Sequence, residues 1–277
     1  MNKTLLKIKN EYDALGKAEK KIADVLLNND KSVPSMFIGD FAQLCDCSVA
    51  TVTRFSKKLG FNGFPQLKIA LAREKDFSPV GENITAADTA AEVFAKICND
   101  IYGSLERTKK SINADELQKC CEAVISADKI FIFGLGNSAS VAQDAAHKLF
   151  RLGKDSTAYT DNHMQAIIAS HLDRQSVAIG ISHSGSSKDI VEALKLSREN
   201  GATTVAITSL GNHPLKKVSD IVLNTVSEET NYRILGLSSR IAQLAIIDAI
   251  YSYLVCHLPG AIDSINKTES ALCSKKY

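Results

Sequence analysis

Apolar residues recur with helical spacing through the first part of the chain. Leu5, Ile8, Tyr12 and Leu15 lie three or four positions apart, a spacing typical of one face of a helix. The same spacing predicts further helices ending near Asn28 and over 38–45, 48–59 and 66–73. Residues 1–77 are therefore expected to be all helical.

From position 129 the pattern changes to short, continuous apolar runs, which are typical of strands buried on both faces. Strands are predicted over 129–135, 156–160, 176–182, 203–209 and 220–226, and helices over 138–151, 187–199, 213–218 and 234–257. This alternation predicts a parallel sheet with helices on both faces. The broad apolar face of the last helix is wide enough to cover a core and a partner subunit.

The length of 277 residues suits two domains. Small and polar residues over 75–90 indicate a linker, and two more helices are expected at about 88–110 and 114–126. We therefore divide the chain into a helical domain at 1–77, a linker with connecting helices at 78–127, an α/β domain at 128–258 and a C-terminal tail at 259–277.

The composition is that of an ordinary globular protein, with 45% hydrophobic and 23% charged residues. We find neither an uncharged apolar run of 18 residues nor a signal sequence, so we expect a cytoplasmic protein without a membrane partner. Seven Cys and six His without metal-ligand spacing predict reduced thiols and no metal or other cofactor.

The charge is unevenly distributed along the chain. Residues 1–77 contain 13 Lys and Arg against 9 Asp and Glu, a balance of +4, whereas the remaining 20 basic and 22 acidic residues give −2. A basic N-terminal region is a mild indication of a polyanionic partner.

Residues 38–60 have the layout of a helix-turn-helix. Ile38, Phe41, Ala42 and Leu44 are expected to face inward in the first helix, as are Val49, Val52, Phe55 and Leu59 in the second. Short polar side chains near the start of the second helix suit base edges, and cations further along suit phosphates. The candidate DNA-binding residues are Ser48, Thr51, Thr53, Arg54, Lys57 and Lys58. A plain helical hairpin with a solvated basic face is the alternative.

Two predicted strand-to-helix turns are rich in small residues: 134–139, GLGNSA, and 181–187, ISHSGSS. Free N–H groups at helix starts attract anions, and hydroxyl groups add donors. We therefore expect a phosphate site that includes Gly136 and the residues Ser182, His183, Ser184, Gly185, Ser186 and Ser187. Two alternatives stay open: a capped helix start that happens to carry several serines, and a dinucleotide site, because 134–139 fits G-x-G-x-x-A and Asp161 follows.

Several motifs in order resemble one known family. Residues 38–60 and the following GFNGFPQLKIAL resemble the helix-turn-helix domain of RpiR-type bacterial transcriptional regulators. Similarity to the SIS (sugar isomerase) domain of these regulators rests on FGLGNSASVAQDAAHKLFRLG, DNHMQA, ISHSGSSKD and EETNYR with SSRIAQLAIIDAIY. The resemblance covers about residues 1–258.

The resemblance implies a flavodoxin-like sheet of five parallel strands and an effector pocket for a phosphorylated sugar. It implies phosphate contacts at Ser182, His183, Ser184 and Ser187, turn contacts at Asn137 and Ser138, and a carboxylate near the sugar at Glu229. We expect a non-enzymatic regulator that binds a double-stranded DNA operator and senses a sugar phosphate. We expect it to be a homodimer or a homotetramer. The alternatives are an aldose–ketose sugar-phosphate isomerase with an accessory helical domain and a dinucleotide-binding protein.

Overall fold

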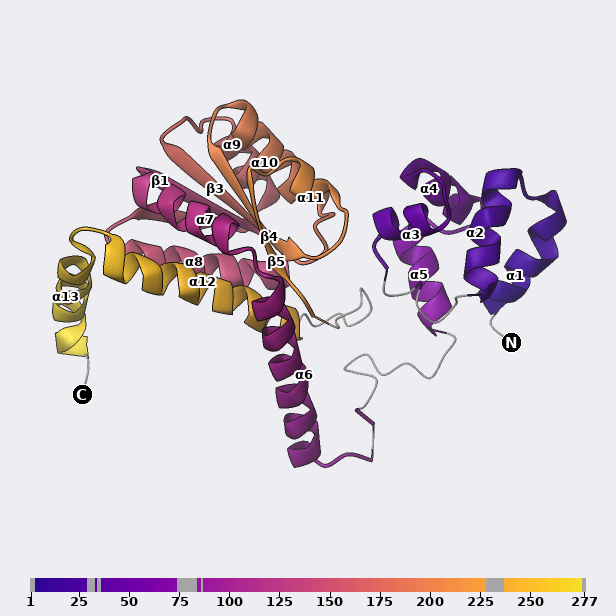
Figure 1. Cartoon of the computed structure of the whole chain (residues 1–277), viewed down its shortest axis with the longest axis horizontal. Helices are drawn as coiled ribbons and strands as arrows, with labels where there is room; N and C mark the ends of the chain where they lie inside the picture. The colour runs from indigo at the N-terminus through magenta and orange to yellow at the C-terminus, as the bar shows by residue number, and fades with distance from the viewer. Residues whose placement is uncertain are drawn as a thin grey trace. The chain divides into compact units, whose positions relative to one another are not determined.

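The structure is a computed structural model that describes residues 3–28, 33, 36–73, 84–85, 87–227 and 237–275 (Figure 1). These residues form two compact units. The first contains the described residues of Met1–Cys98 together with Gly211–His213, and the second those of Asn99–Leu210, Pro214–Glu228 and Leu237–Tyr277.

The first unit begins with a bundle of short helices around one apolar core. The helices are α1 Lys3–Glu11, a 3-10 turn at Tyr12–Ala14, α2 Lys17–Asn28, α3 Ile38–Leu44, α4 Val49–Lys58 and α5 Phe64–Arg73. Phe41 of α3 stacks on Phe64 of α5 with ring centroids 4.8 Å apart, and Ile22, Val52 and Phe55 are fully buried beside them. The prediction of a helical N-terminal domain is confirmed.

Two residues expected in this core lie outside it. Leu44 is 48% exposed and Val49 is 45% exposed. Because α3 ends at Leu44, the next residue, Cys45, takes the inward position and is only 2% exposed. Val49 lies on the same side of α4 as Thr53, whose hydroxyl donates to the Val49 carbonyl at 3.0 Å, and this is the outer side of the helix. The inward assignments of Leu44 and Val49 were wrong.

The second unit is built on a five-stranded, entirely parallel sheet. The strands are β1 Lys129–Gly134, β2 Asp155–Tyr159, β3 Ser176–Ser182, β4 Thr203–Ser209 and β5 Ile221–Thr225. They lie in the order β2-β1-β3-β4-β5, with β1 in register with β2 on one side and β3 on the other. The expectation of a five-stranded parallel α/β domain is confirmed.

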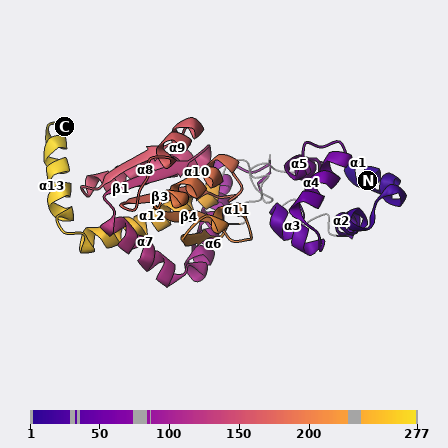
Figure 2. The ribbon, with the colours of Figure 1, turned by 90° about the horizontal axis from the view of Figure 1, so that it is seen from above.

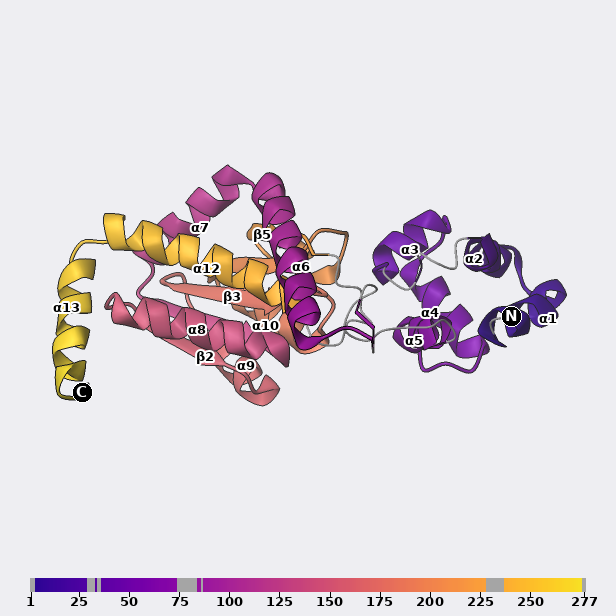
Figure 3. The same cartoon turned by 90° about the horizontal axis from the view of Figure 1, so that it is seen from below.

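Helices cover both faces of this sheet. The helices that follow the first bundle are α6 Ala90–Ser111, which crosses the division between the two units, and α7 Ala114–Ser126, α8 Asn137–Arg151, α9 Asn162–Ala169, α10 Lys188–Glu199, α11 Pro214–Lys217, α12 Leu237–His257 and α13 Ala261–Leu272, with a 3-10 turn at Cys273–Lys275. Figure 3 shows α8 and α12 side by side on one face, and Figure 2 shows α9 and α10 on the other. Alternate residues of each strand point into the two helix layers. Because both faces of the sheet are covered, both faces of the strands are apolar.

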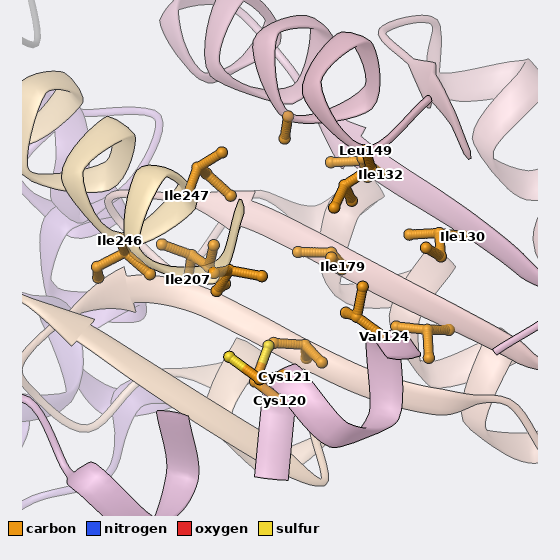
Figure 4. Close-up of a cluster of buried hydrophobic side chains, with 14 of the residues drawn as sticks. Cys120, Cys121, Val124, Ile130, Ile132, Leu149, Ile179, Ile207, Ile246 and Ile247 are labelled. Atoms are coloured by element: carbon orange, nitrogen blue, oxygen red, sulfur yellow. The ribbon is translucent and has the colours of Figure 1, made fainter. Parts of the chain in front are cut away.

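The larger core lies between the sheet and the layer of α7, α8 and α12 (Figure 4). Ile132 and Ile179 from the sheet meet Leu149 of α8 and Ile246 and Ile247 of α12 there. Helix α12 is long and apolar enough to cross a membrane by length and composition alone. Four of its buried side chains, Ile246, Ile247, Ile250 and Leu254, belong to this core.

The C-terminal tail, for which the sequence predicted no element, contains helix α13. Ala261 is buried, and the Arg151 guanidinium of α8 lies 2.5 Å from the Glu269 carboxylate of α13. These contacts attach α13 to the rest of the second unit.

Candidate functional site

Two strands with small-residue turns end side by side in the sheet. Gly134, the last residue of β1, is in register with Ile181 of β3, so the turns at 134–138 and 182–187 start from the same edge. From β1 the chain continues to β2 on one side, while β3 lies on the other. In sheets of this kind, ligands bind at the carboxyl ends of the strands where the direction of connection reverses.

The first turn brings the start of α8 very close to β1. A Cβ atom on Gly134 would lie 2.5 Å from the Ser138 carbonyl oxygen and 3.0 Å from the Ala142 Cβ, so only glycine fits. Gly136 has φ +56° and is the N-cap of α8, where it has no side chain to cap the helix. Gly136 and Asn137 are exposed and Ser138 is half-buried. Among the residues that the structure describes, the N-terminus of α8 thus has no capping side chain.

The second turn is held by backbone hydrogen bonds, and several of its side chains are accessible to solvent. The Gly185 N–H donates to the Ser182 carbonyl at 3.1 Å, and the Gly185 carbonyl accepts from the Leu215 N–H at 3.0 Å. Ser187 is the N-cap of α10, but its hydroxyl makes no capping bond. His183, Ser184 and Ser187 are half-buried, Ser186 is exposed, and Ser182 is buried at the strand end.

The hydroxyl groups of this turn differ in what they already bind. The Ser186 hydroxyl donates to the Ser184 carbonyl at 3.0 Å, and the Ser186 N–H donates to the Ser184 hydroxyl at 3.3 Å. These bonds give the turn its own shape. The uncapped N-termini of α8 and α10 then lie at neighbouring strand ends, an arrangement that suits an anion without needing a cation.

Two residues to which the sequence analysis gave no role support this edge. Gln165 of α9 is fully buried, and its side-chain amide donates to the Tyr159 carbonyl at 2.8 Å and the Gly134 carbonyl at 3.5 Å. Ser209, at the end of β4, donates its hydroxyl to the His183 carbonyl at 2.7 Å. Gln165 belongs to the DNHMQA motif, but the motif alone does not indicate its role. That role, hydrogen bonding to the carbonyls at the strand ends, is seen only in the structure.

The other candidates at this edge have different outcomes. Glu229 lies outside the described residues. The Asp161 carboxylate accepts the Met164 N–H at 2.9 Å as the N-cap of α9, so it is already used where a dinucleotide site would need a ribose-binding acid. Within the described ranges, no group of three or more His, Cys, Asp or Glu is placed to hold a metal ion.

The cysteines are free thiols. Burial raises the pKa of Cys45 to about 12 and that of Cys121 to about 11, and it also raises the pKa of Cys120. These three side chains therefore stay protonated at neutral pH, and protonated thiols are poor metal ligands and poor nucleophiles.

A second candidate surface lies on α4 of the first unit. Ser48 caps this helix, because its hydroxyl accepts the Thr51 N–H at 3.2 Å. Val52 and Phe55 face the core, which leaves Ser48, Arg54, Lys57 and Lys58 exposed and Thr51 and Thr53 half-buried. The predicted DNA-binding residues thus share the outer side of one helix that follows a short turn from α3.

The cations on α4 are not equivalent. Lys58 forms an ion pair with Glu19 of α2 at 2.8 Å, and this pairing holds the pKa of Glu19 below its usual value. Among the described residues, neither Arg54 nor Lys57 forms a salt bridge. Arg54 and Lys57 are therefore the cations of α4 most available to a nucleic acid, and Lys58 must first leave Glu19.

A helix-turn-helix unit joined to a parallel α/β unit is the architecture of a class of transcriptional regulators. Comparison with known proteins agrees with this class. The model of the rpiR-family helix-turn-helix domain matches residues 2–78, and the SIS domain model matches residues 123–253.

Relatives extend this match over almost the whole chain. An uncharacterized HTH-type transcriptional regulator of Caldanaerobacter subterraneus subsp. tengcongensis is 38% identical over 91% of this chain and 90% of its own length. Another, from Thermotoga maritima, is 34% identical over 98% of both chains. The structure of Vibrio vulnificus NanR complexed with ManNAc-6P has a TM-score of 0.88, with 24% identity over 99% of both chains. This chain belongs to the rpiR family of HTH-type transcriptional regulators.

Proposed function

We propose that this regulator binds a phosphorylated sugar at the edge formed by β1 and β3 and that this binding changes the affinity of the first unit for operator DNA. The observation that supports the proposal most directly is that each unit has a surface suited to binding an anion, one with cationic side chains and the other with helix N-termini. One presents Arg54 and Lys57 on α4, and the other presents the uncapped N-termini of α8 and α10.

The proposed sugar-phosphate contacts follow from the geometry of the two turns. The N–H groups at the start of α10, with the hydroxyls of Ser184 and Ser187, would hold the phosphate, since helix N-termini favour negative charge. Asn137 and Ser138, at the start of α8, lie at the adjoining strand end and would contact the sugar or its phosphate. NanR, with the same fold, was solved with ManNAc-6P, which supports a phosphosugar as the effector class.

The proposed operator contacts are those of a helix lying in the major groove. Arg54 would make a bidentate contact to guanine, Lys57 would bind phosphate, and the N-terminal residues Ser48 and Thr51 would approach base edges or phosphates. We infer a cytoplasmic, non-enzymatic protein that is at least a dimer on its operator, because half-site recognition needs two such helices.

The experiment compares Ser184→Ala/Ser187→Ala with the wild type in a thermal-shift screen of hexose and hexosamine phosphates. A ligand at 100 times its Kd adds about 2.7 kcal/mol to stability. We expect one or more sugar phosphates to stabilise the wild type and not the double variant. Ser170→Ala is the matched control, because its exposed hydroxyl bonds within the C-terminal turn of α9.

A turnover assay on the same panel separates the regulator from an aldose–ketose isomerase. Isomerisation needs a base positioned to move a proton between two carbons. Binding without turnover supports the proposal, whereas conversion of an aldose phosphate to a ketose phosphate would establish the enzyme instead. Stabilisation by NAD(P) but by no sugar phosphate would favour a dinucleotide site.

A further inference from the structure

The outer side of α4 differs chemically between its two ends. Its C-terminal half carries the exposed cations Arg54, Lys57 and Lys58, whereas its first two residues are Val49 and Ala50, and both of these are exposed. Val49 leaves 45% of its surface accessible. Because valine and alanine side chains contain no polar atom, they can neither donate nor accept a hydrogen bond. The outer side of α4 is therefore apolar where the helix starts and cationic where it ends.

The hydroxyl groups near the start of α4 already take part in hydrogen bonds within the helix. The Thr53 hydroxyl donates to the Val49 carbonyl at 3.0 Å. The Ser48 hydroxyl accepts the Thr51 N–H at 3.2 Å and shares a further hydrogen bond of 2.9 Å with the Thr51 hydroxyl. Local bonds of this kind use hydrogen-bonding capacity that direct contact with base edges would need. These three side chains are thus less suited to reading bases than their residue types alone indicate.

Stability of the first unit does not account for a valine at position 49. Val49 is not a member of the core cluster of this unit, so packing does not select it. Valine also has a lower helix propensity than alanine, leucine or lysine. A single exposed valine is ordinary on a protein surface. What distinguishes Val49 is its place, between the Ser48 N-cap and the cations of the same helix.

We propose that Val49, together with Ala50, reads the 5-methyl group of a thymine in the operator. The thymine methyl is the apolar group that base pairs present in the major groove. The proposal rests on the proposed function, since a helix that enters the major groove contacts base edges with its N-terminal residues. The cations of α4 then supply affinity for phosphates and for a guanine, and the apolar start of the helix supplies a preference for an A·T pair.

The spacing along α4 relates this thymine to the guanine that Arg54 would contact. Arg54 follows Val49 by five residues and Ala50 by four, which corresponds to a rise of about 6–7.5 Å along the helix. Successive bases of one DNA strand are about 3.4 Å apart. For a helix that lies along the groove, we therefore expect the thymine and the guanine to be about two base pairs apart in each half-site.

Replacement of single thymines by deoxyuridine, which lacks only the 5-methyl group, tests the proposal. The duplex is selected from a random pool with the full-length protein, and dissociation constants are measured by fluorescence anisotropy at one salt concentration. We expect deoxyuridine at one or two positions of each half-site to weaken wild-type binding about fourfold, the equivalent of one buried methyl group. With a C·G pair at the same position, 5-methylcytosine should bind more tightly than cytosine.

Two variants link this effect to one side chain. Val49→Ala removes two methyl groups from an exposed position, and it should bind the thymine and deoxyuridine duplexes with affinities equal within twofold. Ile69→Ala is the matched control, because Ile69 is also a β-branched apolar residue of the first unit and its exposure of 41% is close to that of Val49, but it lies on α5. This control should keep the fourfold difference. Circular dichroism checks that both variants are folded.

The outcomes separate the proposed contact from the proposed function. If the selected duplex binds but deoxyuridine weakens binding at no position, or if Val49→Ala keeps the full difference, the methyl contact is overturned and operator binding by α4 stands. If the protein selects no duplex, operator binding itself fails, and the methyl contact fails with it.

Discussion

The two units differ in the surfaces that we propose bind phosphate groups. On α4 the outer side carries cationic side chains, with Arg54 and Lys57 outside any salt bridge among the described residues. At the ends of β1 and β3, N–H groups and hydroxyls take the place of cations. Long-chain cations suit a polyanion whose counterions are released on binding, whereas a turn of fixed N–H groups suits one small anion held in one geometry. We therefore expect the affinity of the first surface for its ligand to depend on salt concentration, and that of the second surface to depend on the shape of the ligand.

The largest effect is expected from a substitution at the end of β1, where the start of α8 lies too close for a side chain to fit. Gly134→Ala places a methyl group 2.5 Å from the Ser138 carbonyl oxygen, a backbone atom that moves only if α8 moves. We expect a loss of about 1–3 kcal/mol in the stability of the second unit and at least tenfold weaker sugar-phosphate binding. Calorimetry and a binding titration measure the two effects.

Gly180→Ala is the matched control for this change. Its new methyl group meets first the Cδ1 of Leu194, at 2.6 Å, which is the movable end of a side chain. A smaller loss of stability is therefore expected, with sugar-phosphate binding retained. Equal losses of ligand binding for both variants would show that the close approach of α8 to β1 has no special part in the site.

A smaller effect, confined to the first surface, is expected from Arg54→Ala. Loss of a bidentate base contact costs about 1–3 kcal/mol, or roughly 5–150-fold in operator affinity. Fluorescence anisotropy with DNA selected by the protein measures this loss, and sugar-phosphate binding should stay as in the wild type. Unchanged operator affinity at moderate salt would remove Arg54 from the recognition surface.

The core of the first unit should respond to pH through Lys68. Its side chain is 3% exposed, donates to the Met36 carbonyl at 2.8 Å, and burial lowers its pKa to about 8. Between this value and that of the unfolded chain, near 10.5, the unfolded state binds more protons, so stability rises with pH. Relative to Lys68→Met, the wild type should gain about 1–2 kcal/mol between pH 7.5 and 9.5. Parallel stability curves from chemical denaturation would contradict this.

The smallest effect separates two neighbouring lysines. Lys57→Ala should reduce the slope of log affinity against log salt by about 1, as expected for the loss of one phosphate contact. Lys58→Ala should change the slope less, because Lys58 is already paired with Glu19. If Lys58→Ala has the larger effect, then binding to DNA breaks that ion pair.

The sequence predicted the architecture well because both units depend on strong periodic signals. The apolar runs of β1, β3 and β4 and the spacing in α7 gave elements close to those of the structure. The errors came where an element ends: Leu44 and Val49 lie at the two sides of the α3–α4 turn, where periodicity no longer says which side faces inward.

The candidate site was less accessible to sequence reasoning. Proximity of the two turns follows from the pairing of β1 with β3, which strand order along the chain does not determine. The supporting roles of Gln165 and Ser209 depend on hydrogen bonds to the carbonyl groups of Gly134 and His183, which are distant in the sequence. The ion pair between Lys58 and Glu19 joins residues 39 positions apart, so an outward charge on α4 could be predicted but its partner could not.

The most direct test of the central claim is the operator dissociation constant with and without each sugar phosphate, measured for the wild type and Ser184→Ala/Ser187→Ala. For a typical coupling of about 1–3 kcal/mol, one sugar phosphate should change the wild-type value by roughly 5–150-fold, in either direction. The unphosphorylated sugar should change neither protein, and the double variant should not respond while still binding DNA. An equal response of the double variant, or no response of the wild type to any sugar phosphate, would contradict the account.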